Sequence, residues 1–249
     1  MLKEERFEFI LEQLKKESSV SYETFAASLS VSEDTIRRDI EQLYRNGLVS
    51  KVRGGAMLRS KDPLSFQDRT LTYHEEKNAI ALKAQRFIRP GMTIFMDGGT
   101  TVCALASTLQ ADIAVRIITN NVALMPILTA FKHIDIIFLG GEYQANTATT
   151  CGLETTAEVL KYNADLYFMG TCALDDKNGI SAVFKNDAAV KRAMLSASQK
   201  TVVLADSNKL NQTEPFKVTD IHNIDYLVSE LAATDPSLDA YRSLGVSIL

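Results

Sequence analysis

Apolar residues recur at helical spacing near the start of the chain. The first such stretch has apolar side chains at positions i, i+3, i+4 and i+7, the pattern of an amphipathic helix: Phe7, Ile10, Leu11 and Leu14. Lys15 and Lys16 suit the negative end of this helix's dipole. We therefore expect the helix to end near Glu17.

Two shorter helices are predicted next, and each follows a serine that can serve as its N-cap. Ser21 precedes a helix that buries Phe25, Ala26 and Leu29. Ser32 precedes a third helix, with Glu33 and Asp34 in the first turn beside the positive end of the dipole and Gly47 as its stop. The inner stripe of the third helix is Ile36, Ile40 and Leu43.

The opposite face of the third helix is polar and largely basic, because a rotation of about 100° per residue puts four side chains there: Thr35, Arg38, Gln42 and Arg45. After this helix, residues 48–51 and 56–58 are predicted to form a β-hairpin with a glycine-rich, basic tip at residues 52–55. Three helices followed by a hairpin are typical of a winged helix-turn-helix, which we assign to residues 1–58.

The pattern changes after a polar segment at residues 59–74 that contains Pro63 and is predicted to be a linker. From residue 75 onward, helices alternate with short β-branched apolar runs, which is typical of a mainly parallel sheet. The predicted strands are residues 92–96, 114–118, 134–139, 166–169, 201–205 and 226–228. The expected fold class is α/β, with an N-terminal winged helix-turn-helix and a C-terminal sensor domain at residues 75–249.

Composition fits an ordinary globular protein, with 46% hydrophobic and 23% charged residues. No signal peptide or membrane-length apolar run occurs, so we expect a cytoplasmic protein without membrane partners. Cys103, Cys151 and Cys172 are too few and too dispersed for a disulfide framework, and we expect small core residues. The histidines are isolated, so no metal site and no cofactor are predicted.

The net charge of −4 argues at first against nucleic acid, whose phosphates bind lysine and arginine. The first 60 residues are balanced, with ten basic and ten acidic side chains, but residues 42–60 contain no acid. The predicted DNA-contacting set is Ser32, Thr35, Arg37, Arg38, Gln42, Arg45, Lys51 and Arg53. A helical packing module with solvent-facing arginines is the alternative interpretation of this segment.

This segment closely resembles the DeoR family of bacterial repressors. The likeness is carried by Arg6, Ile10 and Leu14, by residues 32–40 (Ser-Glu-Asp-Thr-Ile-Arg-Arg-Asp-Ile) and by residues 53–56 (Arg-Gly-Gly-Ala). The resemblance implies that the third helix reads an operator through Arg37 and Arg38, with Asp39 orienting one of them. Because Arg37 flanks the buried stripe, an ion pair with Asp34 or Glu41 competes with a DNA contact, so Arg38 ranks above it.

Polar or glycine-rich segments follow several predicted strands, and the carboxyl ends of parallel strands share one rim where ligands bind. The first is a glycine turn that opens a helix, a combination suited to phosphate: Asp97, Gly98, Gly99, Thr100 and Thr101. The others supply donors, acceptors and charges: Thr119, Asn120, Gly140, Gly141, Asp187, Lys191, Asp206 and Lys209. Each of these groups has an alternative interpretation as a purely structural feature. Asp187 with Lys191 would then be a surface ion pair, and Asp206 would cap a turn.

The same family has a C-terminal sensor similar in fold to ribose-5-phosphate isomerase. This resemblance implies a phosphorylated sugar or related metabolite as effector, with phosphate on the glycine turn and sugar hydroxyls near Asp97, Thr119, Asn120 and Asp187. The charged contacts would be Lys191 and Lys209. The family often has Glu where this chain has Asp187 and Ser where it has Asn208, so the local geometry and the choice of ligand can differ.

The sequence therefore predicts a repressor of carbohydrate-metabolism genes that a phosphosugar releases from operator DNA. Homodimers or homotetramers are expected, since operator symmetry follows protein symmetry. The competing hypothesis is an isomerase-like enzyme fused to the DNA-binding module, with Asp97, Glu142, Asp187 and Asp206 as available carboxylates. A ligand site fused to a DNA-binding module is explained by ligand binding alone. We therefore predict no catalytic residue and no enzyme activity.

Overall fold

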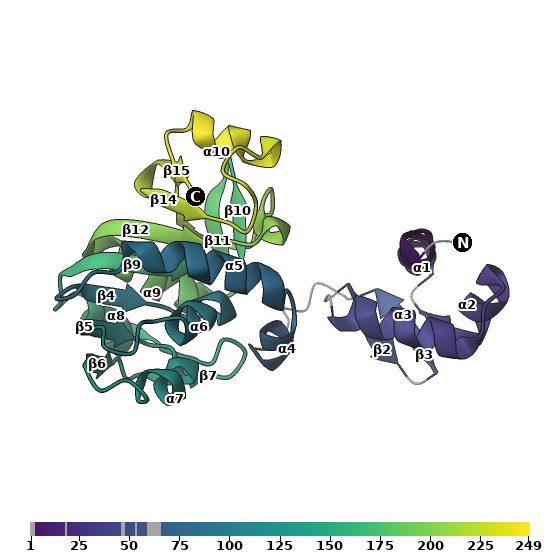
Figure 1. Ribbon diagram of the computed structural model, residues 1–249, viewed down its shortest axis with the longest axis horizontal. Helices are drawn as coiled ribbons and strands as arrows, with labels where there is room; N and C mark the ends of the chain where they lie inside the picture. The colour runs from purple at the N-terminus through teal and green to yellow at the C-terminus, as the bar shows by residue number, and fades with distance from the viewer. Residues whose placement is uncertain (1–2, 18, 46–47, 53, 59–65) are drawn as a thin grey trace. The chain divides into compact units, whose positions relative to one another are not determined.

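The computed structural model describes residues 3–17, 19–45, 48–52, 54–58 and 66–249 (Figure 1). The chain divides into two compact units, residues 1–73 and residues 74–249. No helix in the described ranges is both long and apolar enough to cross a membrane.

The N-terminal unit is a winged helix-turn-helix, as predicted. Its helices are α1 (Lys3–Lys16), α2 (Tyr22–Leu29) and α3 (Glu33–Arg45). Its antiparallel sheet has the order β1-β3-β2 and is built from β1 (Val20–Ser21), β2 (Val49–Val52) and β3 (Gly55–Leu58). Strand β2 is shifted by one residue from its predicted position, and β3 begins one residue earlier than predicted. Strand β1 was not predicted because two residues show no alternating pattern.

Serine caps begin both short helices, as the sequence indicates. The Ser21 hydroxyl accepts a hydrogen bond from the backbone amide of Thr24 at 3.0 Å, and the Ser32 hydroxyl accepts one from that of Thr35 at 3.2 Å. Such a cap stabilises a helix by about 1 kcal/mol. The predicted end of α3 at Gly47 lies outside the described residues.

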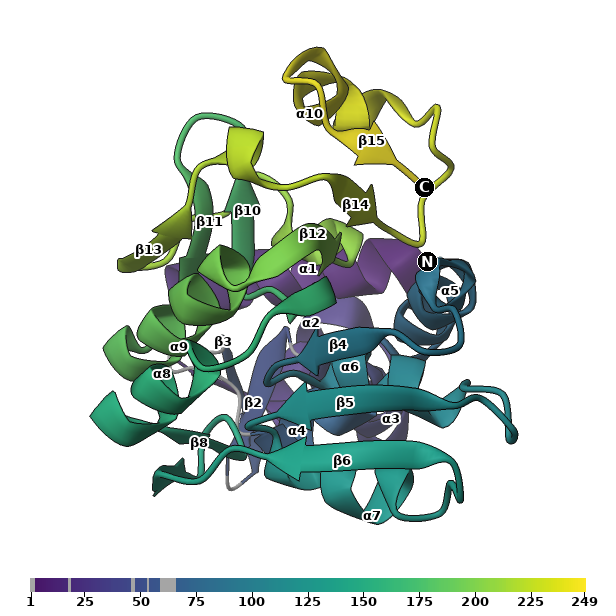
Figure 2. The ribbon, with the colours of Figure 1, turned by 90° about the vertical axis from the view of Figure 1, so that its left-hand side faces the viewer.

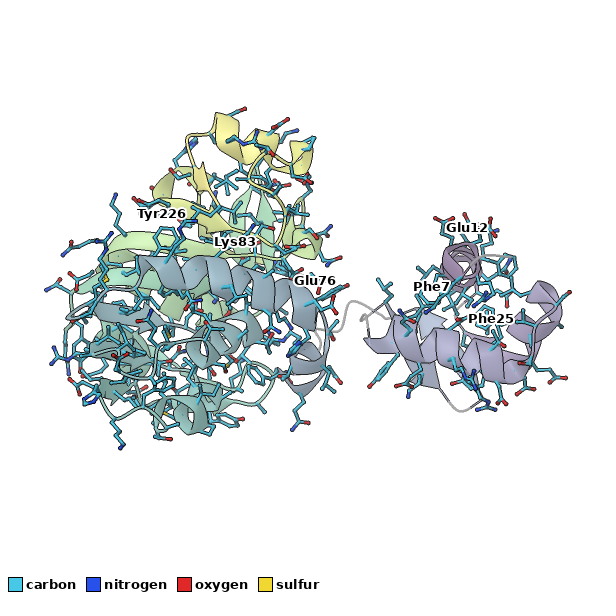
Figure 3. The ribbon with its side chains drawn as sticks, in the orientation of Figure 1. Phe7, Glu12, Phe25, Glu76, Lys83 and Tyr226 are labelled. Carbon is cyan, nitrogen blue, oxygen red and sulfur yellow. The ribbon has the colours of Figure 1, made fainter. Side chains whose placement is uncertain are left out.

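One apolar core joins the three helices to the sheet. Phe25 of α2 is buried in it, and Phe7 of α1 packs against it (Figure 3). The predicted stripe of α3, namely Ile36, Ile40 and Leu43, is fully buried. This packing fixes which face of α3 points outward, so the polar face remains exposed.

The segment predicted as a linker includes a short helix. Residues 59–65 lie outside the described part of the chain, but α4 (Phe66–Leu71) follows at once and buries none of its residues. The first helix of the C-terminal unit, α5 (His74–Ala84), begins at the last residue of the predicted linker.

The C-terminal unit is built on a seven-stranded, fully parallel sheet with the order β15-β14-β12-β9-β4-β5-β6. All six predicted strands are present: β4 (Thr93–Met96), β5 (Val115–Thr119), β6 (Ile134–Phe138), β9 (Ala164–Gly170), β12 (Ser198–Leu204) and β14 (Tyr226–Val228). The edge strand β15 (Ser247–Ile248) was not predicted. The mainly parallel α/β fold is thus confirmed.

The strand order reverses between β4 and β9. From β4 the chain proceeds through β5 to β6 on one side, whereas β9, β12 and β14 lie on the other. In open α/β sheets, loops diverge at such a switch point and leave a crevice at the carboxyl ends of the strands. The loops after β4 and β9 therefore lie where a ligand site is expected.

Helices cover both faces of this sheet, because alternate strand residues point to opposite sides. Ile94 and Met96 pack with α5, α6 (Thr100–Ser107) and α7 (Met125–Leu128). Phe95 packs on the other face, in the core that includes residues of α8 (Leu153–Val159), α9 (Lys185–Ser196) and α10 (Asp239–Ser243). Figure 2 shows α8 and α9 on the side of the sheet opposite α5.

Two small antiparallel sheets were missed by the sequence patterns. One is the hairpin of β7 (Glu142–Gln144) and β8 (Thr149–Cys151). The other joins β10 (Ala173–Asp175), β11 (Gly179–Ala182) and β13 (Phe216–Thr219). These strands are short and mostly lack the alternating apolar pattern that identifies a strand.

Candidate nucleic-acid interface and ligand site

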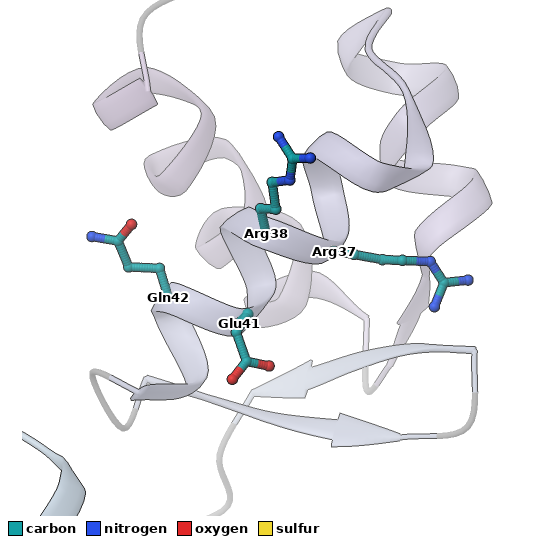
Figure 4. Close-up of a pocket in the computed structure, with 4 residues that line it drawn as sticks. All are labelled: Arg37, Arg38, Glu41 and Gln42. Atoms are coloured by element: carbon teal, nitrogen blue, oxygen red, sulfur yellow. The ribbon is translucent and has the colours of Figure 1, made fainter.

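The exposed face of α3 carries a shallow open hollow lined by Arg37, Arg38, Glu41 and Gln42 (Figure 4). Arg38 and Gln42 extend away from the hairpin, whereas Glu41 points toward it. Within the ranges that the structure describes, no hydrogen bond or ion pair engages the Arg38 side chain. Arg38 is thus available to a partner.

Arg37 is engaged by its neighbours. Its guanidinium lies 3.3 Å from the Glu33 carboxylate and stacks over the Tyr22 ring, 4.6 Å from the centroid. The expectation of an ion pair was correct, but the partner is Glu33 and not Asp34 or Glu41. Glu33 is four residues before Arg37, at the helical spacing that brings side chains together.

Asp39 orients neither Arg37 nor Arg38, contrary to the expectation. It is only 3% exposed and accepts two hydrogen bonds from Arg6 of α1, from Nε to Oδ2 at 2.7 Å and from Nη2 to Oδ1 at 3.1 Å. A bidentate pair of this kind fixes orientation as well as distance. The pair fastens α3 to α1 from the buried side.

The predicted hairpin contacts are only partly described. Lys51 donates a hydrogen bond to Glu41 at 2.7 Å and lies over the Tyr44 ring at 4.7 Å. The hydrogen bond to Glu41 raises the pKa of Lys51 above its ordinary value. Arg53 lies outside the described residues, and so does the side chain of Arg45.

Ser32 and Thr35 hold the first turn of α3. The Ser32 hydroxyl is bonded to the Thr35 amide and also lies 2.9 Å from the Thr35 hydroxyl. Both side chains belong to the cap, so the predicted contacts on α3 with exposed side chains outside the cap are Arg37, Arg38 and Gln42.

A buried charged cluster lies at the switch point of the C-terminal sheet. Asp97 directly follows β4 and is fully buried. Its Oδ1 accepts a hydrogen bond from the Gly170 amide at 2.8 Å, and its Oδ2 accepts bonds from the Tyr167 hydroxyl and from Lys191 Nζ at 2.6 Å. Lys191 also donates to the Gly170 carbonyl at 2.8 Å. The cluster therefore joins β4, β9 and α9.

Asp187 adds a second carboxylate, 3.9 Å from Lys191. Both residues are almost fully buried, so the alternative of a surface helix pair is wrong. Burial raises the pKa of Asp97 to about 6, against the attraction of Lys191. Burial alone would lower the pKa of Lys191, but Asp187 and Asp97 together hold it above its ordinary value.

The glycine turn after β4 meets the loop after β9. Gly99 has φ +141° and is the N-cap of α6, with no side chain capping the helix. A Cβ on Gly170 would lie 2.6 Å from the Gly98 carbonyl oxygen, so only glycine permits this approach. The first amides of a helix lack intrahelical acceptors. Thr100 and Thr101 begin α6 and are almost fully buried.

The loop after β5 contains a buried polar atom without a partner. Asn120 is 1% exposed and donates from Nδ2 to the Thr150 carbonyl at 2.7 Å, but its Oδ1 has no hydrogen-bond partner among the described residues. The Thr119 hydroxyl accepts from the Asn121 amide at 3.0 Å. Asn121 donates to the Asp97 carbonyl at 3.1 Å, which joins this loop to the glycine turn.

The remaining predicted ligand-site residues are Gly140, Gly141, Asp206 and Lys209, and they lie in other local structures. Thr155 donates to the Gly140 carbonyl at 2.6 Å, and a Cβ on Gly141 would lie 2.0 Å from the Thr155 hydroxyl. Asp206 accepts a hydrogen bond from the Asn208 amide at 3.2 Å and so caps a turn, which is the structural role that the sequence left open for it. Lys209 ends that turn and is half-buried. No described contact joins these four residues to the Asp97 cluster.

Sequence reasoning missed two parts of the site. Tyr167 points from the middle of β9 into the cluster, which no local pattern could show. The β7–β8 hairpin covers the ends of β4 and β5: a Cβ on Gly98 would lie 2.5 Å from Thr149 Cγ2, and the Thr150 amide donates to the Asn120 carbonyl at 2.9 Å. The run of threonines at residues 147, 149 and 150, close after a glycine pair, was the available signal.

No group of three or more histidine, cysteine or acidic side chains within the described ranges could hold a metal ion. Cys151 is buried and Cys103 and Cys172 are half-buried, all three as free thiols. The core placement expected for the cysteines therefore holds fully only for Cys151.

Each of the two units matches the description of a known domain family. The description "DeoR-like helix-turn-helix domain" matches residues 6–62, and "DeoR C terminal sensor domain" matches residues 72–231. Together they cover most of the chain.

Three curated relatives align over more than nine-tenths of their length. The HTH-type transcriptional repressor GlcR of Bacillus subtilis (strain 168) is 30% identical over 251 residues, covering 100% of this chain and 96% of that protein. The glycerol-3-phosphate regulon repressor of Escherichia coli (strain K12) is 29% identical over 231 residues, covering 92% of each. The putative aga operon transcriptional repressor of Escherichia coli O157:H7 is 26% identical, covering 98% of this chain and 93% of that protein.

Solved structures give weaker likenesses. Ribose 5-phosphate isomerase A from Neisseria gonorrhoeae aligns with a TM-score of 0.41 and 18% identity, covering 54% of this chain and 52% of that chain. The eIF2B delta structure from Chaetomium thermophilum aligns with a TM-score of 0.47 and 18% identity, covering 64% and 57%. Scores of this size do not establish a common fold.

Proposed function

This chain belongs to the DeoR family of transcriptional regulators, and we propose that it represses its target genes until a phosphorylated sugar or related metabolite lowers its affinity for operator DNA. The observation that carries the DNA-binding part is the exposed face of α3. Arg38 extends from it with no hydrogen bond or ion pair to a described residue, while the opposite face is fixed by an apolar core and by the Arg6–Asp39 pair. A rigid helix with an unengaged arginine suits the reading of guanine in the major groove.

The proposed effector site lies at the loops after β4 and β9, where the strand order of the sheet reverses. The uncapped start of α6, with its glycine turn, offers amides and a positive dipole end to an anion such as phosphate. Asn120 Oδ1 has no hydrogen-bond partner among the described residues and requires a donor, because leaving a buried acceptor unsatisfied costs about 1–3 kcal/mol. A ligand hydroxyl would supply that donor. One of the relatives carries glycerol 3-phosphate in its name, which supports a phosphorylated polyol as the ligand class.

The buried cluster around Asp97 holds the loops of this site together. Because both oxygens of Asp97 are engaged by Tyr167, Gly170 and Lys191, we assign Asp97 to holding the two loops in place rather than to proton transfer. The relatives named above are repressors, and the chain is a regulator rather than an isomerase.

The proposed mechanism couples the two units through an oligomer. Dimers or tetramers of this chain would present paired winged helices to repeated half-sites, and effector binding would favour an arrangement with the wrong spacing. The helix that follows the N-terminal unit, α5, packs directly on α6, whose first turn belongs to the proposed effector site. A change at that turn can therefore reach α5.

Two measurements test the proposed function. In an anisotropy titration at about 0.15 M salt, the protein should prefer a duplex from upstream of its own gene to a shuffled duplex by about a thousandfold or more. In a thermal-shift panel, phosphorylated sugars and polyols should raise the melting temperature more than their unphosphorylated forms. Equal affinity for both duplexes would contradict the regulator, and no stabilisation by any phosphorylated compound would contradict the effector class.

A further inference from the structure

Lys3 lies against the DNA-reading face of α3, although it belongs to a different helix. It is the first described residue of α1 and is exposed. Its ammonium donates a hydrogen bond to the side-chain oxygen of Gln42 and lies 5.5 Å from the centroid of the Phe7 ring. The helix-turn-helix match begins only at residue 6, so Lys3 lies before the part of the chain that the family description covers.

Helix stability does not explain a lysine at this position. The first turn of a helix is the positive end of its dipole, where a cation is unfavourable and an acidic side chain is favoured. A single exposed contact of this kind also contributes little to folding. The side chain is instead placed beside Gln42, which lies one turn after Arg38 on the outward face of α3.

We propose that Lys3 is a DNA-contacting residue that binds a backbone phosphate beside the base edge reached by Gln42. Arg38, Gln42 and Lys3 then form one continuous surface that spans α3 and the start of α1. A lysine ammonium is a compact charge with three donors, so it can keep the bond to Gln42 while a second donor meets a phosphate oxygen. This inference rests on the proposed DNA-binding function.

Phosphate contacts can be counted, because each one releases about 0.9 counterions from duplex DNA. The test compares Lys3→Gln with Lys16→Gln in the full-length chain. Lys16 is an exposed lysine at the other end of the same helix, so its variant makes the same change of charge. Dissociation constants are measured for the operator duplex and for a shuffled duplex from about 50 to 200 mM salt.

For Lys3→Gln we expect weaker binding to both duplexes and a salt slope that is smaller by about 0.9. The affinity ratio of wild type to variant should consequently change by about threefold over this salt range. Lys3→Arg should retain the wild-type slope. Lys16→Gln should leave both affinity and slope unchanged.

Two results would overturn the proposal. One is a Lys3→Gln slope and affinity equal to those of Lys16→Gln. The other is a loss limited to one operator base pair with an unchanged slope, which would show that Lys3 only orients Gln42. A wild-type protein that does not distinguish the two duplexes would instead contradict the proposed function itself. Thermal melting of each variant confirms that the compared proteins are folded.

Discussion

At the scale of single residues, two adjacent arginines with the same chemistry have different surroundings. Arg37 is paired with Glu33 and stacked on Tyr22, whereas Arg38 is unengaged in the part of the chain that the structure describes. A DNA contact by Arg37 would first have to break these interactions. The arginine that is free of intramolecular bonds is therefore expected to contribute more to operator recognition.

Arg38→Ala should lower operator affinity by about 1–3 kcal/mol and relax the preference at one guanine, as expected for loss of a bidentate contact. Arg37→Ala is the matched control and should cost less than 1 kcal/mol. Anisotropy titrations with the operator and with each single-base-pair variant measure both effects. A larger loss for Arg37→Ala than for Arg38→Ala would reverse the assignment.

The Asp97 carboxyl should titrate near pH 6 rather than near its ordinary value of 3.8, because burial disfavours its charged form. Between these two values the folded protein binds a proton that the unfolded chain releases. The contribution of this group to the free energy of unfolding therefore falls as the pH rises from about 4 to 6. NMR titration of ¹³C-labelled aspartate, with the signal assigned through Asp97→Asn, measures the midpoint. A midpoint at or below 4 would contradict this prediction.

At the scale of elements, glycines decide how closely loops approach each other. The loops after β4 and β9 are in contact only because Gly170 has no side chain beside the Gly98 carbonyl. Gly140 follows β6 and is different, since a Cβ there would meet no atom within 4 Å. Two glycines at ends of the same sheet thus have unequal importance for the proposed effector site.

Gly170→Ala should displace the glycine turn, weaken binding of a stabilising phosphosugar at least tenfold and lower the melting temperature. Gly140→Ala should leave both nearly unchanged, because its added methyl group occupies open space. Thermal shift with increasing ligand concentration reports both quantities. Equal effects of the two substitutions would show that contact between the loops is not required for the site.

At the scale of the whole molecule, the proposed regulation is a coupling free energy between two binding functions. Each compact unit has its own apolar core, so neither depends on the other for burial of its side chains. In the proposed mechanism, the units influence each other through differences in affinity between arrangements of an oligomer.

If a phosphosugar lowers operator affinity by a given factor, operator DNA must lower phosphosugar affinity by the same factor. Coupling of this type is typically 5–150-fold, or about 1–3 kcal/mol. Calorimetric titrations of the ligand into the free protein and into the protein–operator complex measure this reciprocity. Equal ligand affinity in the two titrations would exclude effector-driven release.

The sequence by itself determined the features that depend on neighbouring residues. Serine caps, the apolar stripe of α3 and the six main strands follow from short-range spacing, and the glycine turn after β4 was visible as a motif. The short strands β1, β7 and β8 escaped because pairing with distant segments, and not a local pattern, makes them strands.

Only the tertiary structure decided which charged groups meet. Asp97 bonds Tyr167 and Lys191, which are 70 and 94 residues away, and Asp39 bonds Arg6 across 33 residues. The family resemblance implied that Asp39 orients a neighbouring arginine, and local spacing left a surface pair of Asp187 with Lys191 as an alternative. Both interpretations failed because the burial of a charge and its choice of partner depend on segments that come together only when the chain folds.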